Sequence, residues 1–176
     1  MRGLVFVDMD GVVLDTECFQ ENNPKITRSS WNGLFQELGI YSEHEKLKQR
    51  YLSGEFPTYM EWTDEACKVL QKHGLTKEKY FDFIKKRHFM KGAKETVDEL
   101  KKKKYKVALI SGSFQELADR CKRELGLDYA VAHCSLSFDK SGKLQKWTLV
   151  PCDFEGKAVY FRKIADEVGI AHSKCI

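Results

Sequence analysis

The sequence predicts an α/β fold, with a parallel-sheet, Rossmann-like core that a helical insertion interrupts after the first strand. Residues 4–7 and 107–110 are continuous apolar runs, which are typical of strands buried on both faces of a parallel sheet. Between them, apolar residues recur at helical spacing, and no segment has a convincing strand pattern. A chain of 176 residues is long enough for one domain that carries such an insertion.

The first strand is expected to end at Asp8, and the helical insertion occupies residues 16–89. Its helices are indicated by apolar positions three and four residues apart, and Gly39, Gly54 and Gly74 punctuate them. The apolar positions are Trp31, Leu34, Phe35, Leu38, Trp62, Ala66, Val69, Leu70, Tyr80, Phe81 and Ile84. The core is therefore expected to be discontinuous, with residues 1–15 and 90–176.

Strands and helices alternate after the insertion, as in other parallel α/β sheets. The predicted elements are a helix over 93–104, a strand over 107–110, a helix over 114–125, a strand over 129–132, a β-hairpin with arms at 134–138 and 143–150, a helix over 156–168, and the start of a further strand at 174–176. Ser113 and Glu116 have the spacing of a capping box, which predicts that Ser113 caps the helix over 114–125.

Composition and charge exclude several classes of protein. No apolar run approaches the ~18 residues that cross a bilayer, and the run after Arg2 stops at Asp8, too early for a secretory signal. We therefore expect a cytoplasmic protein without a membrane partner. The formal net charge is only +4, and the basic run at 101–104 fits the last turn of a helix, so no nucleic-acid partner is expected.

An acidic pair directly follows the first predicted strand. Asp8 and Asp10 are two residues apart, so an extended backbone places both carboxylates on the same side. Active sites of open α/β sheets lie at the carboxyl ends of strands, so both side chains should face the crevice there. Taken alone, the pair fits a polar strand end or a divalent-cation site.

Two further polar features occupy corresponding places in the predicted sheet. The Ser111 hydroxyl, with the N–H groups of Gly112 and Ser113, would form an anion-binding loop at the end of the second strand. Lys157 lies at the start of the last predicted helix. Each feature alone has a plain interpretation, as a helix cap or a surface lysine. Together they bring an acidic pair, a hydroxyl and a lysine to one edge of the sheet.

These residues resemble the motifs of the haloacid dehalogenase-type phosphatases. The first motif stands at residues 5–17 as VFVDMDGVVLDTE, the second at 108–112 as ALISG, and the third is the lone Lys157. Similarity to the phosphoserine phosphatase branch extends over KGAKETV at 91–97, ELGLDYA at 124–130 and the hairpin with GKL at 142–144. The resemblance implies the α/β core of this family, with the helical insertion as its type 1 cap.

The resemblance also implies a phosphomonoester phosphatase that uses Mg²⁺. Asp8 would attack phosphorus to form an aspartyl-phosphate, and Asp10 would protonate the leaving group and then deprotonate water. Asp8 and the Asp10 carbonyl would hold Mg²⁺, while Lys157, Ser111 and Gly112 would neutralise the phosphoryl oxygens. Glu17 matches a substrate-binding glutamate, and the substrate would be a small phosphorylated metabolite.

Two departures from the family pattern leave alternatives open. The acidic fourth motif, which supplies another Mg²⁺ carboxylate, is absent, and the chain stops where the preceding strand would begin. We expect truncation, the alternative being a catalytically weak binding protein of the same fold. Ala66 stands where the phosphoserine branch has a cap arginine, so other small phosphomonoesters fit as well as phosphoserine. A phosphomutase or phosphotransferase is the second enzymatic alternative.

The cap also contains several aromatic residues whose role is open. Trp31, Phe56, Tyr59 and Trp62 could line the substrate pocket or form the small core of the cap. The second interpretation is favoured, because aromatic residues at helical spacing usually pack against one another.

Overall fold

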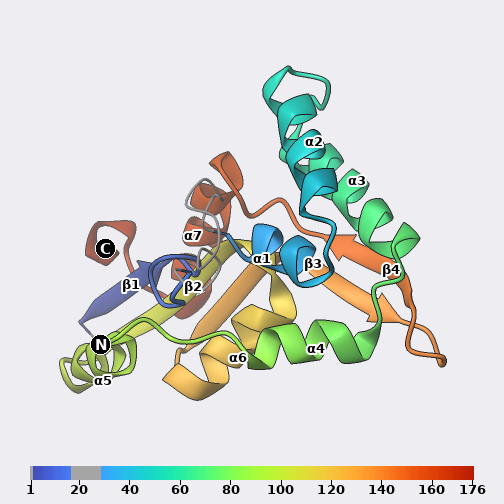
Figure 1. Ribbon diagram of the computed structural model, residues 1–176. Helices are drawn as coiled ribbons and strands as arrows, with labels where there is room; N and C mark the ends of the chain where they lie inside the picture. The colour runs from blue at the N-terminus through green and yellow to red at the C-terminus, as the bar shows by residue number, and fades with distance from the viewer. Residues whose placement is uncertain (1, 17–28) are drawn as a thin grey trace.

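A computed structural model describes residues 2–16 and 29–176 and contains one four-stranded sheet. The strands are β1 (Gly3–Val7), β2 (Tyr105–Phe114), β3 (Tyr129–Phe138) and β4 (Leu144–Leu149), in the spatial order β1-β2-β3-β4. The pairs β1–β2 and β2–β3 are parallel, and β4 is antiparallel to β3. The predicted α/β class with a mostly parallel sheet is confirmed (Figure 1).

Helices cover both faces of the sheet because the central strand is apolar on both sides. Val107 and Leu109 of β2 belong to the core that includes residues of α5 (Ala93–Lys102) and α6 (Gln115–Leu125). Ala108 and Ile110 belong to a separate core with α7 (Glu155–Val168). The two-residue period of a strand thus explains why a continuous apolar run is needed here.

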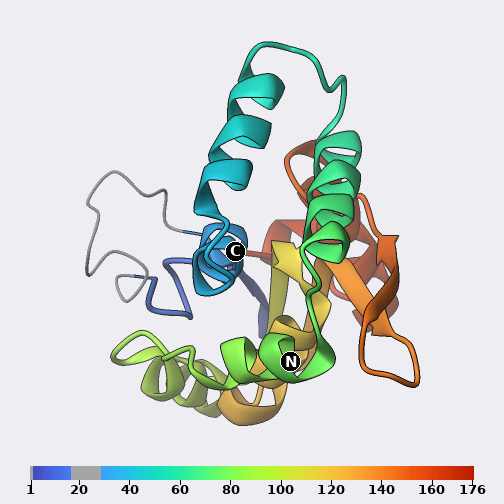
Figure 2. The same cartoon turned by 45° about the vertical axis from the view of Figure 1, so that its right-hand side comes forward.

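The insertion after β1 is helical, as predicted. It contains α1 (Ser30–Glu37), α2 (Tyr41–Leu52), α3 (Tyr59–Lys72) and α4 (Lys77–Lys85). Three of these helices begin at a serine or threonine whose side chain accepts from the backbone N–H three residues later; the caps are Ser29, Thr58 and Thr76. In Figure 2, α2 and α3 rise side by side above the sheet, while α4 lies below them near α6.

The structure corrects the predicted start of α6. The helix begins at Gln115 after the N-cap Phe114, and no side chain caps it, so the predicted capping box is wrong. Strand β2 continues to Phe114 instead, and Ser113 is a strand residue. Glu116 accepts hydrogen bonds from the Tyr80 and Ser135 hydroxyls at 2.8 and 2.6 Å, so its carboxylate is used for tertiary contacts.

Two other strand predictions are modified. Residues 129–132 and 134–138 form the single strand β3, because its first half pairs with β2 and its second half with β4. At the other end of the sheet, His172–Lys174 is a 3₁₀ turn, and Cys175 forms a parallel bridge with Leu4 of β1. The strand predicted over 174–176 is therefore confirmed only in part. Cys175 pairs with β1, whereas Lys174 belongs to the 3₁₀ turn.

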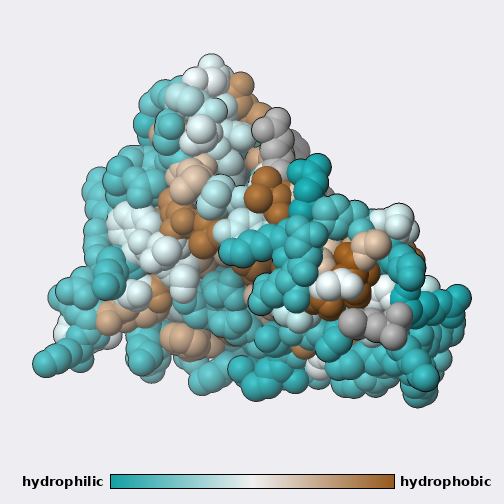
Figure 3. All heavy atoms as spheres, turned by 180° about the vertical axis from the view of Figure 1, so that it is seen from behind, coloured by the Kyte–Doolittle hydropathy of each residue, from teal (hydrophilic) through white to brown (hydrophobic). Residues whose placement is uncertain are grey.

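The described surface is mainly hydrophilic, and hydrophobic side chains gather only in a few places on the face seen in Figure 3. The large hydrophobic residues that are exposed are Val12, Leu52, Phe154, Val159 and Ile176. Among the described residues, no helix has the length and apolar character needed to cross a membrane.

Candidate active site

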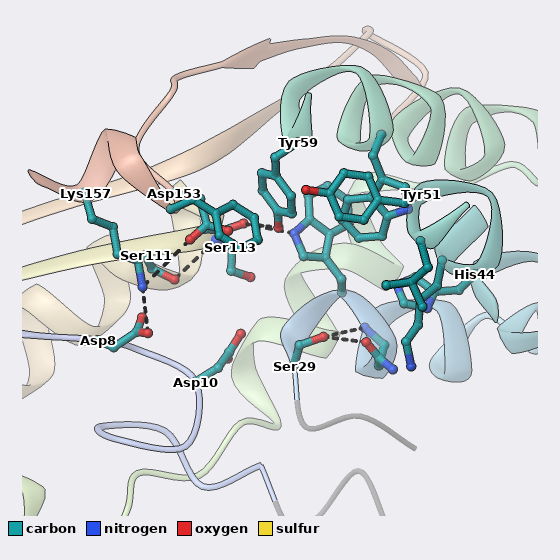
Figure 4. Close-up of a pocket in the computed structure, with 17 residues that line it drawn as sticks. Asp8, Asp10, Ser29, His44, Tyr51, Tyr59, Ser111, Ser113, Asp153 and Lys157 are labelled. Atoms are coloured by element: carbon teal, nitrogen blue, oxygen red, sulfur yellow. Dashed lines mark hydrogen bonds and ion pairs between the residues drawn. The ribbon is translucent and has the colours of Figure 1, made fainter. Parts of the chain in front are cut away.

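The acidic pair lies where β1 ends, beside the end of β2. The ammonium Nζ of Lys157 is 2.8 Å from Oδ2 of Asp8, although the two residues are separated by most of the chain. Ser111 is buried on β2, the parallel neighbour of β1. Figure 4 shows Asp8, Lys157 and Ser111 together on one side of a pocket. The sheet therefore brings the three predicted motifs to one edge.

Asp10 is held by the first turn of the cap. Its carboxylate accepts from the backbone N–H of Ser30 at 2.9 Å and from the Ser30 hydroxyl. Burial raises the pKa of Asp10 above its ordinary value, and the negative charge of Asp8 acts in the same direction. The Ser30 hydrogen bonds lower the pKa and offset part of this effect. The site thus contains a carboxyl group that takes up a proton more readily than a solvated aspartate.

Asp153 is a third carboxylate at this site, which the sequence analysis missed. Its Oδ1 is 3.8 Å from Nζ of Lys157, and it lines the same cavity as Asp8 and Asp10. A Cβ atom added at Gly112 would lie 2.4 Å from Oδ2 of Asp153, so only glycine leaves room for this carboxylate. The signal in the sequence was the spacing of four residues between Asp153 and Lys157.

The segment from Ser111 to Ser113 differs from the predicted anion-binding loop, because it belongs to β2. The backbone N–H of Ser113 donates to Oγ of Ser111 at 3.2 Å, so this donor is already used within the segment. Oγ of Ser113 is buried and has no hydrogen-bond partner among residues 2–16 and 29–176. The hydroxyl of Ser113 is therefore available to bind a ligand in the cavity, whereas the prediction assigned this role to the backbone N–H of Ser113.

Two cap side chains are joined to the second motif. Nε1 of Trp31 and the hydroxyl of Tyr59 both donate to the carbonyl oxygen of Gly112, at 3.1 and 2.9 Å. Burial raises the pKa of Tyr59 well above its ordinary value, so its hydroxyl stays protonated and can donate. These two bonds join α1 and α3 to the end of β2 and close one side of the cavity.

The cavity between core and cap has a volume of about 350 Å³. The predicted residues Asp8, Asp10, Ser111, Gly112 and Lys157 all line it. Trp31, Tyr59 and Trp62 line it too, and Trp31 and Trp62 also belong to the buried core, so both interpretations of the aromatics apply to them. Phe56 packs at the edge of that core.

Two further positions singled out in the sequence are Glu17 and Ala66. Glu17 lies outside the described residues. Ala66 is fully buried in α3 and is not part of the cavity wall. Within the described part of the chain, no group of three or more His, Cys, Asp or Glu side chains is arranged to hold a metal ion. The predicted Mg²⁺ ligands stay the carboxylate of Asp8 and the backbone carbonyl of Asp10.

Comparison with known proteins identifies the family. The chain matches the haloacid dehalogenase-like hydrolases over residues 3–176 and belongs to this family. It is 35% identical over 132 residues to a phosphoserine phosphatase from Archaeoglobus fulgidus, covering 75% of this chain and 34% of that protein. It is 31% identical over 133 residues to a phosphoserine phosphatase from Streptococcus thermophilus, covering 76% of this chain and 55% of that protein. The chain thus spans about a third to just over half of the length of these relatives.

Solved structures agree with this assignment. A phospho-aspartyl intermediate analogue of phosphoserine phosphatase superimposes with a TM-score of 0.77 at 27% identity, covering 99% of this chain and 76% of that one. A substrate-bound phosphoserine phosphatase complex gives a TM-score of 0.78 at 26% identity, with the same coverage. Within its family, the chain falls in the phosphoserine phosphatase-like branch.

Proposed function

We propose that this site hydrolyses a small phosphomonoester through an aspartyl-phosphate on Asp8. The observation that carries the proposal is the arrangement around Asp8, whose carboxylate contacts Lys157 while Asp10 lies two residues away on the same cavity wall. The similarity to a phospho-aspartyl analogue structure of phosphoserine phosphatase supports the same chemistry.

The reaction needs a nucleophile and a group that exchanges protons. A carboxylate oxygen of Asp8 forms a bond to phosphorus, the ester P–O bond breaks, and the leaving alkoxide takes the proton of Asp10. A water molecule then attacks the phosphoryl group while Asp10 accepts its proton, and the bond between phosphorus and Asp8 breaks to release phosphate. The raised pKa of Asp10 favours its protonated form in the first step.

The charge of the site indicates why a cation would be needed. Asp8, Asp10 and Asp153 line the cavity with one nearby lysine, Lys157. At about 4 Å, two unit charges repel by ~4 kcal/mol at an effective dielectric constant of about 20. Mg²⁺ is commonly held by one or two carboxylates together with other oxygen ligands, water and substrate phosphate, so the Asp8 carboxylate and the Asp10 backbone carbonyl fit it. The bound ion would supply positive charge opposite the phosphoryl oxygens.

The cavity limits the size of the substrate. A volume of about 350 Å³, closed on one side by the Trp31 and Tyr59 bonds, suits a small phosphorylated metabolite. The relatives named phosphoserine phosphatases make phosphoserine one candidate, and the buried Ala66 in place of a cap arginine leaves other small phosphomonoesters equally open.

Hydrolysis of p-nitrophenyl phosphate, measured with and without Mg²⁺, tests the proposal. We expect Mg²⁺-dependent turnover that Asp8→Asn abolishes. Asp98→Asn is the matched control, because Asp98 lies on α5 and pairs with Lys94 outside the cavity. Absence of Mg²⁺-stimulated turnover, or full activity of Asp8→Asn, would overturn the proposed function.

A further inference from the structure

Asp153 is an acidic residue at the core end of the cavity that has no role in the two chemical steps proposed above. It lies in the turn between β4 and α7 and lines the same cavity as Asp8 and Lys157. Figure 4 shows Asp153 on the same side of the pocket as these two residues, with dashed lines from Lys157 to both carboxylates. A phosphoryl group on Asp8 would therefore have a second carboxylate close by.

Packing holds the carboxylate of Asp153 close to the predicted phosphate-binding groups. A Cβ atom built on Gly112 would lie 2.4 Å from Oδ2 and 2.9 Å from Oδ1 of Asp153, so both oxygens approach the backbone of β2 there. Gly112 is one of the residues that the sequence analysis assigned to the phosphoryl oxygens. Burial and, after it, the charge of Asp153 raise the pKa of Tyr59, whose hydroxyl donates to Gly112. The negative charge of Asp153 thus acts directly beside Gly112.

Few groups compensate the charge of Asp153. Among residues 2–16 and 29–176, Lys157 is the one cation in ion-pair contact with its carboxylate, at 3.8 Å, and no N–H or O–H group donates a hydrogen bond to it. The same ammonium group lies 2.8 Å from Asp8, so two carboxylates share one lysine. Only 19% of the Asp153 side chain is exposed. Carboxylates that lose contact with water are normally paired or hydrogen-bonded, so this residue has a cost for folding that a function in the cavity would offset.

Binding of phosphate would change the partner of Lys157. Without phosphate, its ammonium group contacts the carboxylates of both Asp8 and Asp153. Phosphate bound at Asp8 offers this ammonium group oxygens with a higher negative charge, and a direct charge-assisted hydrogen bond is stronger than the contact with Asp153 at 3.8 Å. Asp153 then keeps its charge beside phosphate without its cation, and like charges at such short range repel. When phosphate leaves, Lys157 regains its contact with Asp153.

We propose that Asp153 speeds the release of inorganic phosphate by repelling it and by competing with it for Lys157. This inference rests on the proposed function and adds a residue that acts after the chemical steps. Asp153 forms no bond to phosphorus and transfers no proton. A site that binds a phosphoryl group tightly in the transition state also tends to retain the phosphate product, and release of product limits the rate of many enzymes. The charge of Asp153 counteracts this retention.

Binding of inorganic phosphate tests the inference without depending on turnover. The dissociation constant would be measured by titration calorimetry with Mg²⁺ present, in the parent chain and in Asp153→Asn, which keeps the size of the side chain next to Gly112. We expect phosphate to bind about tenfold more tightly to Asp153→Asn, because one like charge beside the ligand is removed. Asp153→Ala also removes this charge and should give a similar increase in affinity.

Asp166→Asn is the matched control. Asp166 lies on α7, is exposed and pairs with His172 outside the cavity, so its loss should leave phosphate binding unchanged. In hydrolysis of p-nitrophenyl phosphate, Asp153→Asn should lower the inhibition constant of phosphate about tenfold, in step with the dissociation constant. It should also lower KM and kcat together and change kcat/KM little, because the release of product becomes slower. A residue that only supports the fold would raise KM or leave the inhibition constant unchanged.

The outcomes distinguish this inference from the proposed function. Equal binding of phosphate in the parent chain and both Asp153 variants, or weaker binding in the variants, would overturn the role of Asp153 and leave the phosphatase proposal standing. A similar gain in affinity in Asp166→Asn would reveal a general effect of net charge and would overturn it as well. Failure of phosphate to bind to the parent chain and to every variant would contradict the phosphate site itself, and the proposed function with it.

Discussion

The two ends of the cavity differ in how their polar groups are satisfied. At the core end, Asp8 contacts Lys157 and Asp10 accepts from Ser30, so the charged groups are held in place before any ligand arrives. At the cap end, His44 and Trp62 have no partner in the described residues. The difference indicates that the core end is preorganised by the protein, whereas the described part of the chain leaves polar groups at the cap end unpaired.

Loss of Lys157 should produce the largest effect at the preorganised end. In Lys157→Met, three cavity carboxylates remain without their nearby cation, and kcat is expected to fall about 10²- to 10³-fold. Lys163→Met on the same helix is the matched control and should retain activity. The measurement is steady-state release of phosphate, and equal losses in both variants would mean that Lys157 has no special role.

Gly112→Ala should disrupt the core end of the cavity through a steric clash. The new Cβ would lie 2.4 Å from Oδ2 of Asp153, so the carboxylate must move, and we expect activity to fall about tenfold to a hundredfold. Stability, as measured by denaturant unfolding, should change little, because only the end of the Asp153 side chain has to move. In an Asp153→Ala background, Gly112→Ala should therefore cause no further loss of activity. Full activity of the single variant would contradict the close approach.

Ser30→Ala tests whether the cap affects proton transfer by Asp10. The Ser30 hydroxyl lowers the pKa of Asp10, so its loss raises that pKa. Asp10 must be protonated in the first step, and activity therefore falls as pH rises through its pKa. The alkaline limb of the kcat/KM profile should move to higher pH by about one unit or less. A shift to lower pH would contradict the assignment of Asp10 as the acid.

Tyr59→Phe should have the smallest effect, because Trp31 still donates to the same carbonyl oxygen of Gly112. We expect a loss of about 1 kcal/mol in the free energy of unfolding and a few-fold rise in KM, with kcat little changed. Tyr160→Phe on α7 is the control on the other face of the sheet. A larger effect on kcat than on KM would instead place Tyr59 in the chemical step.

The sequence predicted the core end far better than the cap end. Asp8 directly follows β1, Ser111 lies near the carboxyl end of β2, and Lys157 lies in the first turn of α7. The topology of a parallel sheet brings such positions together. Ser30 and Asp153 were missed because their contacts, with Asp10 and Lys157, depend on how α1 and the turn before α7 pack against the core. Such contacts join separate elements and leave no periodic pattern in the chain.

The same limit explains the other differences. Ser113 and Glu116 have capping-box spacing, yet β2 extends through Ser113, and Glu116 bonds to Tyr80 instead. Pairing of β2 with β3, which reaches Phe114 and Cys134, overrides the local preference for a helix start. The burial of His44 could not be predicted either, since a histidine on an amphipathic helix fits a surface or a core position equally until its surroundings are known.

Trapping the phosphorylated chain tests the central claim most directly. In Asp10→Asn, the water that attacks the intermediate lacks its base, while p-nitrophenolate needs little protonation to leave. After incubation with p-nitrophenyl phosphate and Mg²⁺, acid quenching and peptide mapping should find a phosphoryl group on the peptide that contains Asp8, and the double variant with Asp8→Asn should lack it. A phosphoryl group on another residue, or none in any variant that still turns over, would contradict the mechanism.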